Sequence, residues 1–474
     1  MKDNRTSVKR SLFVSAIALT LTAALLIGST FAWFTSTAST GVSKVEAGKL
    51  KVTLLNDNKE LSSTDVLTWQ KAEGQTGTAL WEPGCTYNLE PITIKNTGSL
   101  ALKYKIVITG IKGDADLNKV IDWTVNDTAL DADHPLAVGE SNELTISGHM
   151  QENADDNYQG KTIDGISITV VATQDTVEYD SNGNQYDKDA EYPIPVTTGD
   201  ELQAIVSNAT APVNIVLTNN ITTNNFVIPA DKDVTLDLNG RTVTNDESHT
   251  ILNKGHLTLT DSSADKSGQI ISCKADTAAL RNGDNAVCVV ESGTISRDGA
   301  NGNTWHTVEN FGTMTFNGGK VIADDGKSFA IVNGWNYIDP GEQKATMTIN
   351  NIEMKAGPNG FKNCAGGTLT MNDGTLHCTG YWGLSNDSTG VATINGGKII
   401  SDKYIAISDG GAKMEINGGT FTGPQGSLYV QDYAQDTVVK GGSYQNETVE
   451  FMQSCCPKGY TAKPEGGMVV VSKD

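Results

Sequence analysis

From Val234 onward, apolar and polar positions recur along the chain with a spacing near 23 residues. The phrases MTFNGGKV, LTMNDGTL, ATINGGKI and MEINGGTF show the shared pattern. A repeat of this length is typical of solenoid proteins, in which each repeat forms one coil. Because apolar residues alternate with polar ones and show no helical period, the pattern predicts coils built from β-strands.

Two polar columns set the register of the predicted coils. We interpret both as turn positions, where stacked Asn side chains share hydrogen bonds and glycine supplies the positive φ angle of a corner. The first column is Asn253, Asn282, Asn310, Asn333, Asn363, Asn386, Asp409 and Asp432. The second column is Asn239, Thr260, Glu291, Asn317, Asn350, Asn372, Asn395, Asn417 and Lys440.

Three apolar columns lie at constant offsets from these turns, which predicts three strands per coil with one face turned inward. Two places before the first turn stand Ile251, Leu280, Val308, Ile331, Phe361, Leu384, Ile407 and Val430. One place before the second stand Leu238, Leu259, Val290, Phe316, Ile349, Met371, Ile394, Ile416 and Val439. Four places after it stand Ile295, Val321, Met354, Leu376, Ile399, Phe421 and Tyr444. Residues 196–474 are therefore predicted to form a right-handed parallel β-helix.

A stack of parallel coils exposes unpaired strand edges at both ends, so capping elements are expected. Residues 200–206 predict a short helix before the first coil, with Asp200 or Gly199 near its N-cap. Residues 459–471 predict a closing hairpin at the other end.

Residues 33–177 lack the repeat and contain alternating strands such as KLKVTLL, ITIKN, LKYKIVITG and GISITVVAT, separated by Gly, Pro, Asn and Asp. This pattern predicts an antiparallel β-sandwich. Residues 178–195 form an acidic linker between the two parts. The whole chain is thus expected to be all-β, with two domains after the leader.

Residues 1–32 have the features of a secretory signal peptide: a basic start, an apolar run and small residues before a cut between Ala32 and Trp33. An uncleaved anchor is the alternative. The formal charge of the chain is −21, and cleavage leaves −24, which disfavours nucleic acid and anionic lipid as partners. We expect a secreted protein at the cell surface or in the extracellular matrix, with no membrane contact after cleavage.

The repeat half resembles the pectate-lyase-like β-helix modules of secreted and surface proteins of gut Gram-positive bacteria, through VTLDLNGRTV and the NGG turns. That superfamily includes lyases, hydrolases, adhesins and plain stalks. The resemblance therefore implies a fold, and leaves the activity open.

The N-terminal part is similar to the camelysin/TasA family of exported biofilm-fibre proteins. The similarity lies in GSTFAWFTSTAST, EAGKLKV, WEPGCTYNLEPITIKNTGSLALKYKIVITG and NYQGKTIDGISITVVATQ. It implies a jelly-roll subunit and a SipW-type signal peptidase that cuts after Ala32. It also implies that residues 33–45 donate a strand to a neighbouring subunit. A strand at the edge of the same subunit is the alternative.

Metal chemistry receives little support from the residues. The chain has no HExxH motif, and its histidines do not form helical pairs. In the linker, Asp180, Asn182, Asn184 and Glu191 match positions of a calcium loop, but Gln185 replaces the turn glycine, and a solvated linker is the alternative. No cofactor is expected.

Acidic residues on the predicted coils do not form a pair suited to glycosidic bond cleavage. Asp237, Glu291, Glu309 and Glu353 are spread over different coils, and each is predicted to be a solvated surface acid.

Aromatic residues give a candidate ligand face. Trp305, Tyr381 and Tyr404 each stand five places before the first turn column, so they are expected to share an outward face on which sugar rings could stack. Scattered surface aromatics are the alternative. Trp335 is expected beside this face, and Trp382 is expected in the core.

Seven cysteines in a long exported chain do not indicate a disulfide framework. Cys288 and Cys378 occupy inward offsets and are predicted to be core residues. A Cys364–Cys378 bridge within one coil stays open.

These patterns favour a non-enzymatic surface or biofilm-matrix protein. The β-sandwich would serve assembly or anchoring, and the β-helix display, adhesion or glycan binding. A carbohydrate-active β-helix enzyme, either a polysaccharide lyase or a glycoside hydrolase, is the alternative. A simple fibre subunit is a third interpretation.

Overall fold

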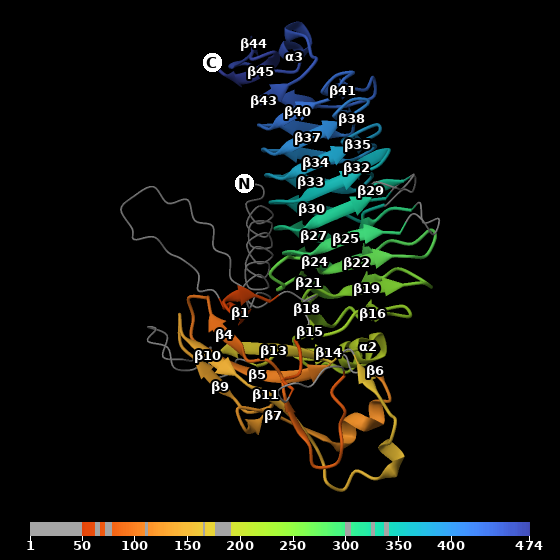
Figure 1. The fold of residues 1–474 in the computed structure, drawn as a ribbon. Helices are drawn as coiled ribbons and strands as arrows, with labels where there is room; N and C mark the ends of the chain where they lie inside the picture. Colours follow the sequence, from red (N-terminus) through yellow and green to blue (C-terminus); the bar gives the residue numbers. More distant parts are fainter. Residues whose placement is uncertain are drawn as a thin grey trace, which may run out of the picture.

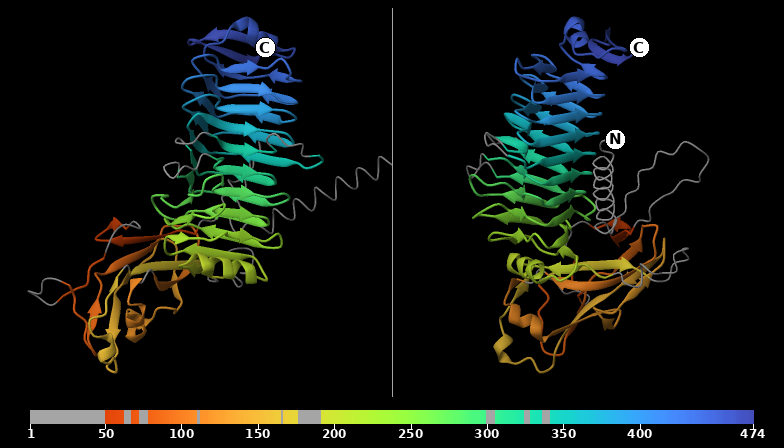
Figure 2. Two further views of the ribbon diagram at one scale, coloured as in Figure 1. Left: turned by 90° about the vertical axis from the view of Figure 1, so that its right-hand side faces the viewer. Right: turned by 180° about the vertical axis from the view of Figure 1, so that it is seen from behind.

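The computed structural model describes residues 50–61, 67–71, 78–109, 112–164, 166–175, 191–298, 305–323, 328–335 and 341–474. Antiparallel sheets form the N-terminal part, and a parallel β-solenoid of about 10 turns follows over residues 194–444. The coils stack into a column with the N-terminal sheets at its base (Figures 1 and 2). The predicted all-β fold class is confirmed.

The larger apolar core of the N-terminal sheets includes Ile94 of β4, Tyr104 of β5 and Ile146 of β11, and a smaller cluster contains Leu117, Ile121 and Met150. The strand orders are β10-β4-β1-β2, β3-β11-β7-β8, β13-β5-β9 and β12-β6. Their bounds are β1 (Val52–Asn56), β2 (Lys59–Glu60), β3 (Thr86–Asn88), β4 (Ile92–Asn96), β5 (Leu102–Thr109), β6 (Lys112–Gly113), β7 (Ile121–Val125), β8 (Thr128–Ala129), β9 (His134–Leu136), β10 (Ser141–Leu144), β11 (Ile146–Met150), β12 (Ile163–Asp164) and β13 (Ser167–Gln174). Two 3-10 helices, η1 (Ala115–Val120) and η2 (Asp156–Tyr158), connect strands.

Each coil of the solenoid contributes one strand to each of three parallel sheets. Sheet 1 contains β14 (Ile194–Val196), β15 (Val213–Leu217), β18 (Asp233–Asp237), β21 (His256–Thr260), β24 (Val287–Val290), β27 (Thr313–Phe316), β30 (Ala345–Ile349), β33 (Gly367–Met371), β36 (Val391–Ile394), β39 (Lys413–Ile416) and β42 (Thr437–Val439). It begins at Ile194, inside the predicted linker.

Sheet 2 contains β16 (Ile221–Thr222), β19 (Thr242–Asn245), β22 (Gln269–Ser272), β25 (Thr294–Arg297), β28 (Lys320–Ala323), β31 (Glu353–Ala356), β34 (Thr375–Cys378), β37 (Lys398–Ser401), β40 (Thr420–Thr422) and β43 (Gly442–Tyr444). Sheet 3 contains β17 (Val227–Ile228), β20 (Ile251–Asn253), β23 (Leu280–Asn282), β26 (Val308–Asn310), β29 (Phe329–Asn333), β32 (Asn359–Asn363), β35 (Leu384–Asp387), β38 (Ile407–Gly410) and β41 (Leu428–Val430).

The three predicted apolar columns line the interior. The members of the second and third columns are all at most 1% exposed, and in the first column only Val430 is half-buried. Cys288 and Cys378 are fully buried in the same core, as predicted. All seven cysteines are free thiols, so the Cys364–Cys378 bridge is not formed.

The first polar column forms a buried hydrogen-bonded ladder, here called the inner ladder. Each amide Nδ2 donates to the Oδ1 of the next coil at 2.7–2.8 Å, from Asn253 through Asn282, Asn310, Asn333, Asn363 and Asn386 to Asp409. Asp409 suits the last place because an ionised carboxylate only accepts hydrogen bonds, and it also accepts from Thr437 Oγ1 at 2.6 Å. The predicted eighth member, Asp432, is exposed and outside the ladder.

The second polar column forms an outer ladder of opposite polarity. Here each Asn donates to the preceding coil, from Asn417 through Asn395, Asn372, Asn350 and Asn317 to Glu291, at 2.7–2.9 Å. The carboxylate of Glu291 ends this ladder at its acceptor side, as Asp409 ends the inner one.

Both ends of the solenoid carry caps. Helix α2 (Gly199–Asn208) covers the first coils, and its N-cap is Thr198, whose side chain accepts from Glu201 N. Gly199 is the first residue of the helix, next to the cap, as predicted. The predicted C-terminal hairpin is β44 (Tyr460–Glu465) with β45 (Met468–Lys473), which joins the end of sheet 2.

A second helix at the C-terminal cap, α3 (Val449–Ser454), was not predicted. Cys455, which follows it, accepts a backbone hydrogen bond from Val439 N at the end of sheet 1. Glu447 accepts from Ser427 N and Leu428 N at the end of sheet 3. These contacts satisfy three backbone N–H groups at the C-terminal end of the column.

The inner ladder leads to a first prediction. Replacing Asn333 with Ala removes hydrogen bonds to Asn310 and Asn363 inside a dry core, and we expect the free energy of unfolding to fall by about 3 kcal/mol. Urea denaturation followed by circular dichroism measures this change. The matched control is Asn350→Ala in the outer ladder, where water can replace the amide, and we expect a loss below about 1 kcal/mol. Equal losses in both variants would contradict a stabilising role specific to the buried ladder.

Candidate functional site

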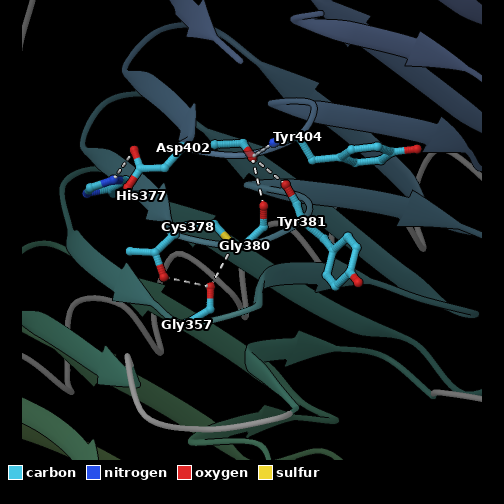
Figure 3. Close-up of polar contacts among 9 residues, drawn as sticks. Gly357, His377, Cys378, Gly380, Tyr381, Asp402 and Tyr404 are labelled. Carbon is cyan, nitrogen blue, oxygen red and sulfur yellow. Dashed lines mark hydrogen bonds and ion pairs between the residues drawn. The ribbon is translucent and has the colours of Figure 1, made fainter. Parts of the chain in front are cut away.

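The turns between sheets 2 and 3 place Tyr381 and Tyr404 at equivalent positions of adjacent coils. Each stands three residues before Leu384 or Ile407, which are paired in sheet 3. Neighbouring parallel strands are roughly 4.8 Å apart, so the two side chains leave the solenoid one coil step apart. In Figure 3 both rings point to the same side, away from Cys378.

Backbone contacts fix these turns. Tyr381 N donates to Pro358 O at 2.6 Å, and any side chain on Gly380 would collide with the Pro358 backbone. The buried hydroxyl of Ser401 donates to Tyr381 O at 2.5 Å and accepts from Tyr404 N at 3.0 Å. The tyrosine rings therefore project from rigid backbone, which lowers the entropic cost of binding a ligand.

The rings of Tyr381, Trp382 and Tyr404 form one group, here called the aromatic turn cluster. Tyr381 and Tyr404 meet edge to face with centroids 5.9 Å apart, and Trp382 lies 4.6 Å from Tyr404. Tyr381 is 58% exposed, whereas the other two rings are half-buried. The prediction that Trp382 is a core residue was wrong, because the turn directs its ring outward onto Tyr404.

Trp305 stands apart from this cluster. It occupies the same turn position three coils earlier, roughly 14 Å along the column by the coil step, and it is 37% exposed. Its indole Nε1 donates to Glu309 Oε1 at 2.8 Å. Trp335 is almost fully buried and packs on Phe311 with centroids 5.4 Å apart. The predicted single aromatic face is therefore two separate groups.

Glu309 is a buried acid, which contradicts its prediction as a solvated one. It points away from the solenoid interior yet is only 3% exposed, and its carboxylate is bound by the Trp305 indole and by Arg281 Nη1 at 2.9 Å. Burial raises the pKa of Glu309, and the Arg281 charge counteracts part of that increase. The sequence could not reveal this because Trp305 comes from a turn and Arg281 from the neighbouring coil.

The other three acids have separate roles. Glu353 lies at the surface in an ion pair with Lys320, as predicted. Glu291 ends the outer ladder. Asp237 is half-buried, accepts hydrogen bonds from Asn239 N and Ser262 N, and has a pKa raised by burial.

Two further polar pairs were missed at the sequence level. His377 Nε2 lies 2.9 Å from Asp402 Oδ1, on the side of the turn opposite the tyrosine rings (Figure 3). Lys362 points outward from sheet 3. Its Nζ lies 3.2 Å from Asp387 Oδ2 and is positioned over the ring of Phe329. The alternation of strand residues indicates their outward direction, but only the stacking of coils shows which residues become partners.

A cleft of about 570 Å³ lies near the base of the solenoid, where Pro212, Asp233 and His256 contribute to its lining. Lys232, its nearest cation, is bound by Ala209 O and Asp231. Its lining is dominated by small and loop residues and contains no aromatic platform comparable to the turn cluster.

Several predicted positions lie outside the described residues: Ala32, Trp33, the segment 33–45, Asp180, Asn182 and Asn184. Within the described residues, no three His, Cys, Asp or Glu side chains are grouped to hold a metal ion. In the same part of the chain, no helix has both the length and the apolar character needed to cross a membrane.

Comparison with protein-family profiles, with curated proteins and with solved structures found no match for this chain.

Buried histidines lead to a pH prediction. His306 packs beside Trp305 with Nδ1 2.7 Å from Ser328 Oγ, and burial lowers its pKa from 6.5 to about 4. As pH falls, the unfolded chain binds a proton at His306 before the folded chain does. The free energy of unfolding therefore decreases by about 3 kcal/mol for this group between pH 6.5 and pH 4. His306→Gln should remove that part of the pH dependence.

Urea denaturation at pH 7 and pH 4.5 measures the effect. The control is His377→Gln, at the surface, which should retain the pH dependence of the original chain. The same pH dependence in both variants would contradict the role of His306.

Proposed function

We propose that the chain is an exported surface or matrix protein whose solenoid binds polysaccharide through the aromatic turn cluster. The observation that carries this proposal is the pair of outward tyrosine rings held in register on adjacent coils. Tyr rings offer an apolar face for the CH groups of a pyranose and a hydroxyl for its polar groups. Two adjacent coils present the platform, which suits a ligand with neighbouring sugar units.

Export and assembly are proposed from the N-terminal sequence. A SipW-type signal peptidase would cut between Ala32 and Trp33 and free the chain from the membrane. Residues 33–45 would then add a strand to a neighbouring subunit, in the manner of the camelysin/TasA family. The N-terminal sheets would anchor or assemble the protein, and the solenoid would display the binding face in the biofilm matrix or at the cell surface.

A binding role fits the cluster better than catalysis. Glycoside hydrolysis by the common mechanisms needs two carboxyl groups roughly 5–9.5 Å apart across the bond that is cut. Near the rings, the described residues offer Asp402, which is paired with His377 on the opposite side of the turn. The arrangement of the described residues around the rings therefore supports binding as the proposed role of the cluster.

One observation favours the alternative of a carbohydrate-active enzyme. Glu309 combines a raised pKa with a neighbouring Trp305 ring and the Arg281 cation, and such a carboxyl group could act as a general acid. Its hydrogen bonds to both neighbours also suit a purely structural ion pair. If Glu309 has only a structural role, the original chain should not depolymerise polysaccharide. Turnover abolished by Glu309→Gln and retained in Glu353→Gln would establish the enzyme instead.

The binding proposal predicts the effect of removing the rings. A glycan array with the full chain should identify a bound glycan. Tyr381→Ala combined with Tyr404→Ala should weaken its affinity at least roughly tenfold, because each stacked ring contributes about 1 kcal/mol. Isothermal titration calorimetry with the identified glycan measures the loss.

Tyr433→Ala is the matched control, because Tyr433 is a similarly exposed tyrosine at 59% on a different turn. The affinity of the Tyr433→Ala variant for the glycan should equal that of the original chain. Retained binding in the Tyr381/Tyr404 variant would remove the aromatic turn cluster from the binding site.

A further inference from the structure

The outer face of sheet 1 carries a regular array of small polar residues. On β27, β30, β33 and β36 the inward positions are apolar and fully buried. The outward positions have the order Thr, Thr, Asn on the first three strands, and Val391 replaces the first threonine on β36. The rows are Thr313, Thr315 and Asn317; Thr346, Thr348 and Asn350; Thr368, Thr370 and Asn372; and Val391, Thr393 and Asn395. We call this surface the threonine face.

Strand register aligns the rows into columns. Thr315 pairs with Thr348, Thr348 with Thr370, and Thr370 with Thr393. Members of one column are therefore roughly 4.8 Å apart, and neighbouring columns are roughly 6.6 Å apart along the strands. Figure 1 shows the strands of sheet 1 stacked along the column from β15 to β33.

The outer ladder fixes one border of this face and leaves hydrogen-bonding groups of its amides unused. Asn350, Asn372 and Asn395 are exposed, and each uses one N–H and the carbonyl oxygen for the ladder. An amide has a second N–H and a second lone pair, so each coil retains one donor and one acceptor for a ligand. Among the described residues, the threonine hydroxyls of the face make no hydrogen bond to protein.

The threonine face is uncharged on a strongly acidic chain. The net charge is −21, yet no row of these four coils has a charged member. Charges begin at its two ends, with Glu291 on one side and Lys413, Glu415 and Lys440 on the other. A neutral partner rich in hydroxyl groups matches such a surface, whereas an anionic polymer would be repelled by the charge of the molecule as a whole.

A second copy of the chain is a poorer occupant. Four strands of three outward positions cover roughly 250 Å², well below the roughly 800 Å² per partner of a stable protein interface. A polymer can compensate for a small contact area per coil by repeating its contacts along the column, as multivalent ligands do.

We infer that the threonine face is a second binding surface, which takes extended chains of a neutral polysaccharide lying along the solenoid. The inference builds on the proposed polysaccharide binding and adds a surface distinct from the aromatic turn cluster. The methyl groups of the threonines would contact the CH faces of the sugars, and the threonine hydroxyls and free amide groups would bond the sugar hydroxyls.

The test measures retention of the full chain on insoluble particles of amorphous cellulose, β-1,3-glucan and chitin, with calcium polygalacturonate gel as the anionic comparison. We expect retention on at least one neutral particle and none on the gel. Thr348→Lys combined with Thr370→Lys places charge at the centre of the face and should reduce retention at least tenfold. Thr348→Val combined with Thr370→Val keeps the shape, removes the hydroxyls and should reduce retention by a smaller factor.

The matched control is Thr294→Lys combined with Thr375→Lys, on the outer face of sheet 2. It should retain wild-type binding, and thermal unfolding of each variant reports whether the fold is intact. Unchanged retention of the Thr348/Thr370 lysine variant would overturn the inference, as would retention on the anionic gel alone. A lysine-dependent shift from dimer to monomer in sedimentation would assign the face to a second copy and also overturn it.

The two proposals fail separately. Tyr381→Ala combined with Tyr404→Ala tests the aromatic turn cluster on the soluble glycan and leaves the threonine face intact. If that variant loses binding while the lysine variant keeps full particle retention, only the threonine face is refuted. If no neutral particle retains the original chain, polysaccharide binding at the threonine face is refuted, whether or not the chain binds the soluble glycan.

Discussion

The buried chain of amide hydrogen bonds in the inner ladder is the constraint on which the solenoid depends. An Asn side chain inside an apolar column is costly unless its donor and acceptor both find partners. Here each amide donates to the ladder member of the next coil at 2.7–2.8 Å, and backbone groups such as Gly312 N and Gly312 O provide further partners. A slip of one coil by a single residue would break these bonds and turn apolar residues outward, so the ladder enforces one register.

That register determines where the surface residues stand. Extra residues between ladder members are accommodated in turns: Asn333 and Asn363 are 30 residues apart, whereas Asn363 and Asn386 are 23 apart, with equivalent hydrogen bonds. The tyrosines of the aromatic turn cluster and the rows of the threonine face therefore recur at the coil step. Both surfaces follow from regular stacking, with no long-range arrangement of separate loops.

The sequence predicted the parts of the fold that repeat. Constant offsets identified the inward columns and the two turn columns, because every coil supplies an independent example of the same requirement. Features present once were missed: helix α3 and the loss of Asp432 from the ladder both depend on how the C-terminal end is closed. The two ladders have opposite polarity because the Asn side chains donate to the next coil in one and to the preceding coil in the other. The residue types alone do not specify this direction.

For the candidate site, the sequence identified aromatic residues at turn positions but not their grouping. Tyr381 and Tyr404 came together because their coils are adjacent, and Trp305 did not because two coils intervene. Glu309 and Trp382 were misplaced for a related reason, since strand alternation reports direction from the solenoid axis and not whether a turn covers the residue. Whether an outward side chain is buried depends on tertiary contacts, which a repeat pattern does not predict.

We propose that the regular outer surface of this solenoid binds polysaccharide and does not cleave it. A crystal structure of the full chain soaked with a neutral β-linked oligosaccharide tests the claim most directly. We predict an intact sugar chain against Tyr381 and Tyr404 or along the threonine face, with Glu309 still bound to Trp305 and Arg281. A shortened product beside Glu309, with both of those surfaces free of sugar, would contradict the account.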